Sequence, residues 1–236
     1  FPDYDARFKY PGKTGQARLF QALGAPHPHT WIFDDTKHFQ RCGSKVFDAG
    51  FPLVFKLDWG GEGDTVSLLQ SQADLARALS MAEIYEQSGQ RGFVVQTRVA
   101  DSNRTLRVAV IGQTQMAYWR IQDNPGIFGT GLAQGARIDT ESDPNLRQKA
   151  VALTRGFCQQ SRINLAGFDF IFERCGPRKS DLQPLFLEIN YFFGRTGLGG
   201  SARFYTMLQA EIDNWLVGLG LAVNRSSTAT AAKERQ

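Results

Sequence analysis

The chain has 236 residues, of which 42% are hydrophobic and 21% are charged, as expected for a globular protein with one large domain or two closely packed lobes. The formal net charge is +4, but Arg225, Lys233 and Arg235 against Glu234 place +2 of it beyond residue 223. The body of the chain is therefore only mildly basic. This balance favours a phosphate-rich small ligand and argues against nucleic acid as a partner.

The three cysteines, Cys42, Cys158 and Cys175, lie far apart and show no C-x-x-C spacing. This pattern argues against a disulfide framework or a zinc ribbon and fits a reducing compartment. No apolar stretch approaches the length of a membrane span, and no signal-peptide pattern is present at the start of the chain. We therefore expect a cytoplasmic protein with no membrane partner. The first residue is Phe1 and not Met, which is consistent with a fragment or a trimmed chain.

Hydrophobic periodicity and turn residues predict several short strands and a few amphipathic helices. Strands are expected at residues 30–33, 51–57, 93–99, 106–111, 116–121, 166–172 and 185–190, and helices at 14–23, 71–88, 143–157 and 201–219. Because the strands outnumber the helices and cluster along the chain, we predict an α+β fold and exclude a doubly wound nucleotide-binding fold.

Capping residues support two of the helices. Ser71 and Asp74 resemble a capping box, and Asp143 before Pro144 is the expected N-cap of the third predicted helix. The last helix is expected to bury one apolar stripe, formed by Phe204, Leu208, Ile212, Trp215 and Leu219.

Two motifs with familiar chemistry fail on inspection. Gly12-Lys13-Thr14 ends like a P-loop, but the required earlier glycine is replaced by Arg7 and no apolar strand precedes the motif. In His27-Pro28-His29, Pro28 and the preceding Pro26 stiffen the chain, and no further metal ligands lie nearby in sequence. We therefore interpret this segment as a loop without a metal.

The most informative segments are the predicted strands around Asp169 and around Glu188-Ile189-Asn190. Glu188 and Asn190 share one face of their strand, because successive side chains point to opposite faces. If Asp169 lies on an adjacent strand, three oxygen-bearing side chains converge with no cation nearby in sequence to neutralise them. Since carboxylates are rarely left unpaired in a core, a Mg²⁺ ion bound with substrate phosphates would resolve the conflict. Structural hydrogen bonding is the alternative interpretation.

A lysine and a glycine-rich loop add a possible phosphate site. Lys56 lies near the end of an apolar strand, directly before the loop that contains Gly60, Gly61 and Gly63. A strand-terminal ammonium and a loop backbone can both contact phosphate, although each feature alone is often only structural.

The order of these parts resembles the ATP-grasp superfamily, particularly glutathione synthetase and the ribosomal-protein glutamate ligases. The resemblance covers residues 9–200. It rests on the ordered set Leu106-Arg107-Val108, Tyr118-Trp119-Arg120-Ile121, Gly167-Phe168-Asp169 and Leu187-Glu188-Ile189-Asn190.

The resemblance implies two α+β lobes with the nucleotide site between antiparallel sheets, and an N-terminal pre-ATP-grasp domain that is absent or truncated. The implied parts are a lead-in segment and helix at 1–28, a small lobe with a glycine-rich lid at 29–98, a large lobe with the metal site at 99–223 and a disordered tail at 224–236.

It also implies roles for individual residues. The implied nucleotide-binding residues are Lys13, Lys56, Gly60, Gly61, Gly63, Gln96, Thr97, Arg98 and Val99, the last four forming a hinge whose backbone contacts adenine. Arg107, Arg120 and Arg195 would contact the transferred phosphate or the acyl acceptor, and Asp169, Glu188 and Asn190 would bind magnesium. Without a family role, the strand arginines Arg98, Arg107 and Arg120 could equally pair with carboxylates such as Asp101 or Asp123.

The sequence departs from the family pattern in the loop after Arg120. Gly129 and Gly131 stand where related ligases commonly carry an arginine and an asparagine, so one phosphate contact and one metal-side amide are missing. Arg137 is a candidate substitute.

The resemblance thus implies an enzyme that uses ATP and Mg²⁺, with Mn²⁺ as an alternative, to join a carboxylate to an amine through an acyl phosphate. Its partners would be small-molecule or peptide carboxylates and amines, with a homo-oligomer or a separate N-terminal domain as further expectations. A small-molecule kinase and a catalytically weakened ATP-binding module are the alternatives.

Overall fold

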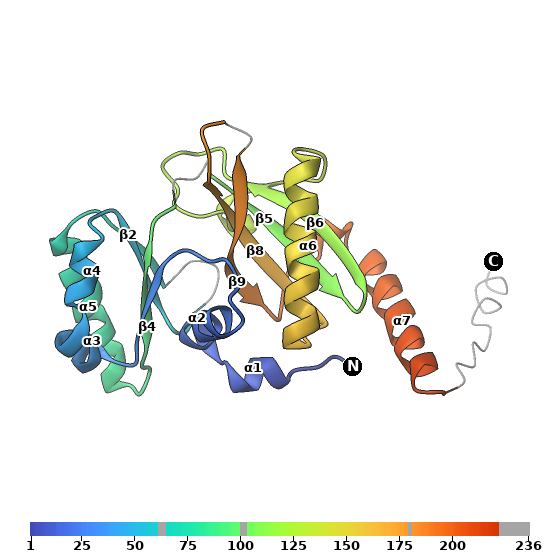
Figure 1. The fold of residues 1–236 in the computed structure, drawn as a ribbon, viewed down its shortest axis with the longest axis horizontal. Helices are drawn as coiled ribbons and strands as arrows, with labels where there is room; N and C mark the ends of the chain where they lie inside the picture. The colour runs from blue at the N-terminus through green and yellow to red at the C-terminus, as the bar shows by residue number, and fades with distance from the viewer. Residues whose placement is uncertain (61–64, 100–102, 179–180, 222–236) are drawn as a thin grey trace, which may run out of the picture.

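The structure is a computed structural model that describes residues 1–60, 65–99, 103–178 and 181–221. It consists of two antiparallel sheets with helices packed against their outer faces, which confirms the predicted α+β class (Figure 1). The predicted tail at 224–236 and the lid glycines Gly61 and Gly63 lie outside the described residues. No helix in the described part of the chain is long and apolar enough to cross a membrane.

The first sheet, sheet A, has the strand order β1-β4-β2-β3. Its strands are β1 (Thr30–Phe33), β2 (Leu53–Leu57), β3 (Val66–Leu69) and β4 (Phe93–Thr97). Three helices cover its outer face: α3 (Thr36–Cys42), α4 (Ser44–Asp48) and α5 (Gln72–Gln87). Phe55, Phe93 and Val95 pack under these helices, so the alternate residues Lys56 and Gln96 point to the opposite face.

The second sheet, sheet B, has the strand order β7-β6-β5-β8-β9. Its strands are β5 (Arg104–Ile111), β6 (Thr114–Ile121), β7 (Arg137–Asp139), β8 (Leu165–Arg174) and β9 (Leu182–Asn190). Helix α6 (Pro144–Ser161) packs its Ala150 and Phe157 against Phe168 and Phe186 on one face of the sheet. The polar residues of the central strands therefore project from the other face.

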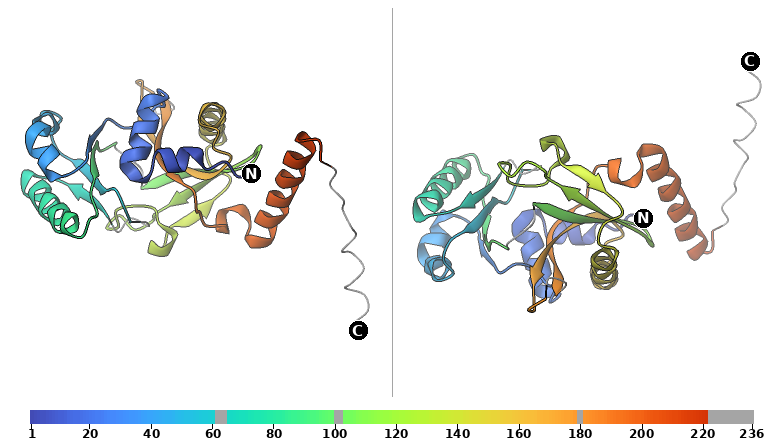
Figure 2. Two further views of the ribbon diagram at one scale, coloured as in Figure 1. Left: turned by 90° about the horizontal axis from the view of Figure 1, so that it is seen from below. Right: turned by 90° about the horizontal axis from the view of Figure 1, so that it is seen from above.

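Helix α2 (Gly12–Ala22) connects the two sheets, as Figure 2 shows. The Gln16 side chain donates to the carbonyl of Ile189 at 2.9 Å and accepts from its amide at 2.8 Å. At the start of the helix, the Thr14 amide donates to Asp58 Oδ1 at 2.6 Å. The preceding short helix α1 (Asp5–Lys9) continues along the same side of the molecule.

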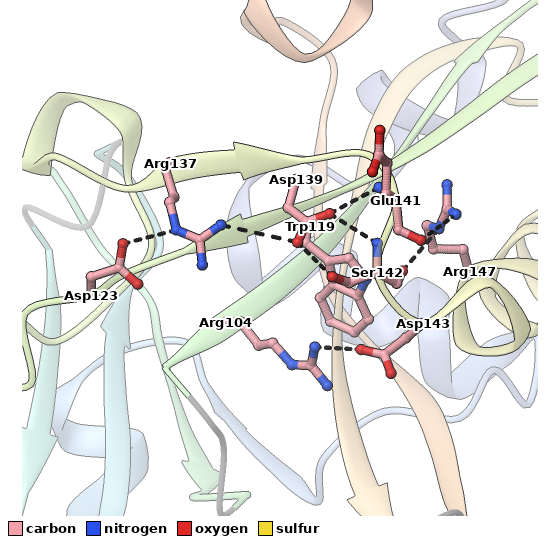
Figure 3. A network of polar contacts seen from close by, with 9 residues as sticks. All are labelled: Arg104, Trp119, Asp123, Arg137, Asp139, Glu141, Ser142, Asp143 and Arg147. Carbon is pink, nitrogen blue, oxygen red and sulfur yellow. Dashed lines mark hydrogen bonds and ion pairs between the residues drawn. The ribbon is translucent and has the colours of Figure 1, made fainter.

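A polar network fixes the turn between β7 and α6 (Figure 3). The Asp139 carboxylate accepts from the amides of Glu141 and Ser142 and from the Ser142 hydroxyl, which together hold the pKa of Asp139 down at about 2. Asp143 precedes α6, but its side chain makes no capping hydrogen bond and pairs instead with Arg104. Asp143 is the N-cap and Pro144 begins the helix, as predicted, but the Asp143 side chain does not cap, because its backbone is left-handed with φ of 48° and its carboxylate pairs with Arg104.

The last helix, α7 (Ser201–Gly218), lies only partly on the body of the protein (Figures 1 and 2). Phe204 is buried against sheet B, next to the short helix η2 (Thr196–Leu198). Trp215 and Leu219 are 43% and 58% exposed. The prediction that the whole apolar stripe is inward was wrong, since the second half of the helix extends past the sheet.

Glu211 is the polar anchor of α7. Its carboxylate accepts from the amide of Gln113 at 3.0 Å and from the amide and hydroxyl of Thr114 at 3.1 and 2.7 Å, in the turn between β5 and β6. We expect Glu211→Ala to lower the free energy of unfolding by about 2–3 kcal/mol, because three partly buried donors lose a charged acceptor. Urea denaturation measures this change, with exposed Gln209→Ala as the control. Equal midpoints for the two variants would contradict the anchoring role.

Candidate functional site

A cavity of about 410 Å³ lies between the inner faces of the two sheets and is closed on one side by α2. The structure brings most of the predicted site residues together around it. Its lining includes Lys13, Lys56, Gln96, Thr97, Arg98, Val99, Arg107, Arg120, Asp169, Glu188 and Asn190. Five of these side chains are cationic and two are acidic, so the cavity has an excess of positive charge suited to a polyanion.

Asp169 is the centre of the polar contacts on sheet B. The register places it opposite Arg107 on β5 and opposite Glu188 on β9. Its Oδ1 accepts from Arg107 Nε at 2.7 Å. Its Oδ2 accepts from Arg107 Nη2 at 2.8 Å, from Arg120 Nη2 at 2.8 Å and from Asn190 Nδ2 at 3.0 Å.

These contacts give Asp169 two cationic neighbours that are distant from it in sequence. Asp169 was expected to lack a neighbouring cation, yet two arginines neutralise it across the sheet. Burial alone would raise the pKa of Asp169, but Arg107 and Arg120 hold it below its usual range. Surface carboxylates were the alternative partners expected for these arginines, but both arginines pair with the buried carboxylate of Asp169.

Glu188 differs from Asp169. Its carboxylate lines the cavity and makes no hydrogen bond or ion pair with any residue in the described part of the chain. A register shift after Asp169 pairs Phe170 with Phe186, so Leu187 also lines the cavity beside Glu188 instead of pointing away. Glu188 is thus the carboxylate available to a ligand.

Lys56 reaches the cavity from sheet A. It is buried, and its Nζ donates to Gln96 Oε1 at 2.9 Å. Burial lowers the pKa of Lys56 to about 8, an effect that Lys13 reinforces and that Glu188 and Asp169 oppose. The Lys56 ammonium therefore lies in the cavity with the neutral Gln96 amide as its hydrogen-bond partner.

Lys13 lies at the start of α2, next to the root of the glycine-rich loop. Its Nζ donates to the carbonyls of Gly60 at 3.0 Å and Trp59 at 3.4 Å. Gly60 does not line the cavity, and its φ of +87° is a conformation that favours glycine.

Arg120 is held from a second direction by threonines. Its Nη2 donates to Thr105 Oγ1 at 3.1 Å, and Thr105 Oγ1 lies 2.5 Å from Thr130 Oγ1 in the loop after β6. Arg120 Nε is buried and has no hydrogen-bond partner among the described residues.

Two glycines of this loop, Gly129 and Gly131, line the cavity. Gly129 has a φ of +109°, and a side chain at Gly129 or Gly131 would contact Gln134 in the adjoining short helix η1 (Leu132–Gln134). Arg137, considered as a substitute for the missing arginine, pairs instead with Asp123 at 2.9 Å and does not line the cavity.

Arg195 is not brought into the cavity. Its guanidinium lies over the rings of Phe204 and Tyr205 at 4.7 and 4.6 Å, and it donates to the Tyr205 hydroxyl at 2.8 Å. It lines a shallow separate hollow at the start of α7.

Residues 97–99 cross from sheet A toward sheet B at the edge of the cavity. Val99 packs with Ile171 and Leu185, and Leu187 packs against this cluster. The crossing therefore has an apolar side, of the kind that accommodates a flat ring system.

Sequence reasoning missed several residues of the site. Thr30, Thr105 and Tyr118 line the cavity, and Gln16 ties α2 to β9 beside Asn190. Thr105 lies two residues before Arg107 on the same strand, and this period of two could have indicated a shared face. Tyr118 likewise lies two residues before Arg120 on β6. Thr30 gave no such signal, since it lies in a mainly apolar segment.

The fold and this site define an α+β ligand-binding domain with a cationic cavity between two antiparallel sheets. Residues 14–207 match the RimK-like ATP-grasp domain family, and the chain belongs to that family. Comparison with curated proteins gives no match.

Solved structures confirm the ATP-grasp fold. The RimK domain ATP-grasp protein of Sphaerobacter thermophilus has a TM-score of 0.62 at 14% identity, covering 87% of this chain and 69% of the other. D-alanine–D-alanine ligase of Bacillus anthracis complexed with ATP has a TM-score of 0.65 at 16% identity, with coverages of 91% and 68%. Biotin carboxylase of Campylobacter jejuni has a TM-score of 0.66 at 14% identity, with coverages of 89% and 48%. These likenesses show that the chain has the architecture of ATP-dependent ligases and carboxylases.

Proposed function

We propose that the protein is an ATP- and Mg²⁺-dependent ligase that joins a carboxylate to an amine through an acyl phosphate, releasing ADP and phosphate. The observation that carries this proposal is the cavity itself. It combines an excess of cationic side chains with one carboxylate, Glu188, that makes no hydrogen bond or ion pair in the described part of the chain. A triphosphate with a bound cation complements both features.

The adenine of ATP would lie against the apolar side of the crossing at 97–99. Leu187 and Ile171 supply contact area there, and the backbone of residues 97–99 is near enough to the cavity to hydrogen-bond a base. The triphosphate would extend toward Lys56 and Lys13, whose ammonium groups are point charges suited to phosphate oxygens.

The residues present fit a magnesium ion only in part. Glu188 offers a carboxylate, and Asn190 retains its amide oxygen because only its Nδ2 is used on Asp169. Asp169 already accepts four hydrogen bonds, so it becomes a ligand only if an arginine moves away. No group of three or more His, Cys, Asp or Glu residues suited to a metal occurs in the described residues, which agrees with a metal held jointly by protein and phosphates. A bound Mg²⁺ would neutralise phosphate charge and orient the leaving group.

The proposed reaction has two steps. A carboxylate oxygen attacks the γ-phosphorus and the bond to the bridging oxygen breaks, so that ADP leaves and an acyl phosphate forms. The amine then attacks the acyl carbon, loses a proton and displaces phosphate. Arg107 and Arg120, which line the cavity, would supply positive charge where negative charge develops, and this charge needs no rearrangement of water.

A second candidate is an ATP-binding module with weakened turnover. Gly129 and Gly131 favour it, because the loop offers no cationic or amide side chain at two positions on the cavity wall. A small-molecule kinase would retain the same nucleotide site.

An ADP-release assay over amino acids, short peptides and polyamines, with Mg²⁺ present or withheld, separates these functions. A ligase should release ADP and phosphate in equal amounts, only with Mg²⁺ and a suitable carboxylate and amine. A kinase should release ADP without phosphate. ATP-dependent thermal stabilisation without ADP in any mixture would identify the module, and no stabilisation by ATP would contradict nucleotide binding altogether.

A further inference from the structure

A chain of buried hydrogen bonds joins Lys56 to the backbone of Pro28, just before strand β1. Lys56 Nζ donates to Gln96 Oε1 at 2.9 Å, and Gln96 Nε2 donates to Thr30 Oγ1 at 2.9 Å. The Thr30 hydroxyl donates to the carbonyl of Pro28 at 2.6 Å. All three side chains are at least nine-tenths buried.

The donors and acceptors of this chain permit one arrangement of the Gln96 amide. The Pro28 carbonyl can only accept, so the Thr30 hydroxyl must donate to it and presents its lone pairs to Gln96. The Lys56 ammonium can only donate, so it requires the amide oxygen. The Gln96 nitrogen therefore points to Thr30 and its oxygen to Lys56.

We propose that Gln96 is a positioning residue that holds the Lys56 ammonium in the cavity without neutralising it. The sheet register explains how it reaches Lys56: Val54 is opposite Gln96, so Lys56 lies two residues along the same face. A glutamate at position 96 would form an ion pair with Lys56 and could not donate to Thr30. The glutamine thus leaves the full charge of Lys56 available to an anionic ligand.

The surroundings of Lys56 agree with this role. The charged groups that face it are Lys13 from α2, Asp169 from β8 and Glu188 from β9. Lys56 makes no ion pair with any residue among those the structure describes. Its ammonium is therefore buried with an amide as its direct partner, and it should lose its proton more readily than an exposed lysine.

The first test follows Lys56 in the ligand-free protein by NMR of ¹³C-labelled lysine, with the signal assigned by its absence in Lys56→Arg. We expect Lys56 to titrate near pH 8 in the natural protein. Gln96→Glu should raise this midpoint by about one to three pH units, because an opposite charge stabilises the ammonium. Gln96→Met should lower it. An unchanged Lys56 midpoint in folded Gln96→Glu would overturn the proposal.

The second test measures ATP affinity at pH 7 and rests on the proposed function. Gln96→Met should weaken ATP binding about tenfold, the value of one lost charge-assisted hydrogen bond. Thr30→Val, which removes only the partner that orients the amide, should have a smaller effect in the same direction. Gln90→Met, on an exposed loop, is the control and should bind ATP normally.

The two tests separate two kinds of failure. If the natural protein binds no ATP while the Lys56 midpoint still responds to Gln96→Glu, the proposed function is wrong and the positioning role stands. If ATP binds equally well to the natural protein and to folded Gln96→Met, Gln96 does not position Lys56 for the nucleotide.

Discussion

Lys56→Met should lower ATP affinity by about 10- to 100-fold while leaving the ligand-free protein folded, since a hydrogen bond between charged groups is typically worth about 1.5–3 kcal/mol. The expected effect on stability is small or even favourable. The natural side chain is a buried ammonium without an ion pair among the described residues, and methionine removes the cost of desolvating that charge. Calorimetric titration with ATP and Mg²⁺ gives the affinity, and a thermal melt gives the stability.

The prediction is specific because ATP affinity should fall while the stability of the ligand-free protein stays the same or rises. A lysine needed only for folding would lower the melting temperature together with the affinity. Lys37→Met, an exposed lysine on α3 outside the cavity, is the matched control and should change neither quantity. ATP affinity equal to that of the natural protein in folded Lys56→Met would contradict the assignment of Lys56 to the phosphate site.

Asp169→Asn should destabilise the fold by about 3–5 kcal/mol at neutral pH, because two buried guanidinium groups lose their shared carboxylate. The pKa of Asp169 is held below its usual range, so its contribution is present above the unfolded pKa and disappears as the pH falls through the folded value. The stability of the natural protein should therefore fall in acid, and that of the variant should fall less. Urea unfolding from pH 7 down to pH 3 measures both.

Asp123→Asn provides the control for this comparison. Asp123 also pairs with an arginine, Arg137, but its side chain is 67% exposed. Its replacement should change stability by less than about 1 kcal/mol. If the two asparagine variants unfold at the same denaturant concentration, the buried Asp169 contacts contribute no more than a surface ion pair.

The sequence predicted much of the fold because most elements carry a local signal. The capping box at Ser71 forms as expected, with the Asp74 amide donating to Ser71 Oγ at 3.3 Å. Alternation along β9 correctly placed Glu188 and Asn190 on one face. Strands β3 and β7 were missed: β7 has only three residues, too few to show a period, and β3 has no sustained alternation of apolar and polar residues.

The contacts of the site were less predictable because they depend on which strands become neighbours. Arg107 reaches Asp169 through the register of β5 against β8, which lies far from β5 in sequence, and Arg120 reaches it through the register of β6 against β5. The bulge that brings Leu187 to the cavity has no signature in the sequence. Similarly, the spacing of apolar residues along α7 predicts an apolar stripe. It does not show that the sheet ends before Trp215 and leaves that side chain exposed.

The most direct test of the central claim is a crystal structure with a non-hydrolysable ATP analogue and Mn²⁺, whose anomalous signal locates the metal. We expect the triphosphate between the two sheets beside Lys56, and the metal within about 2.5 Å of a Glu188 carboxylate oxygen. A nucleotide bound outside this cavity, or a metal bound to the triphosphate but away from Glu188, would contradict the account.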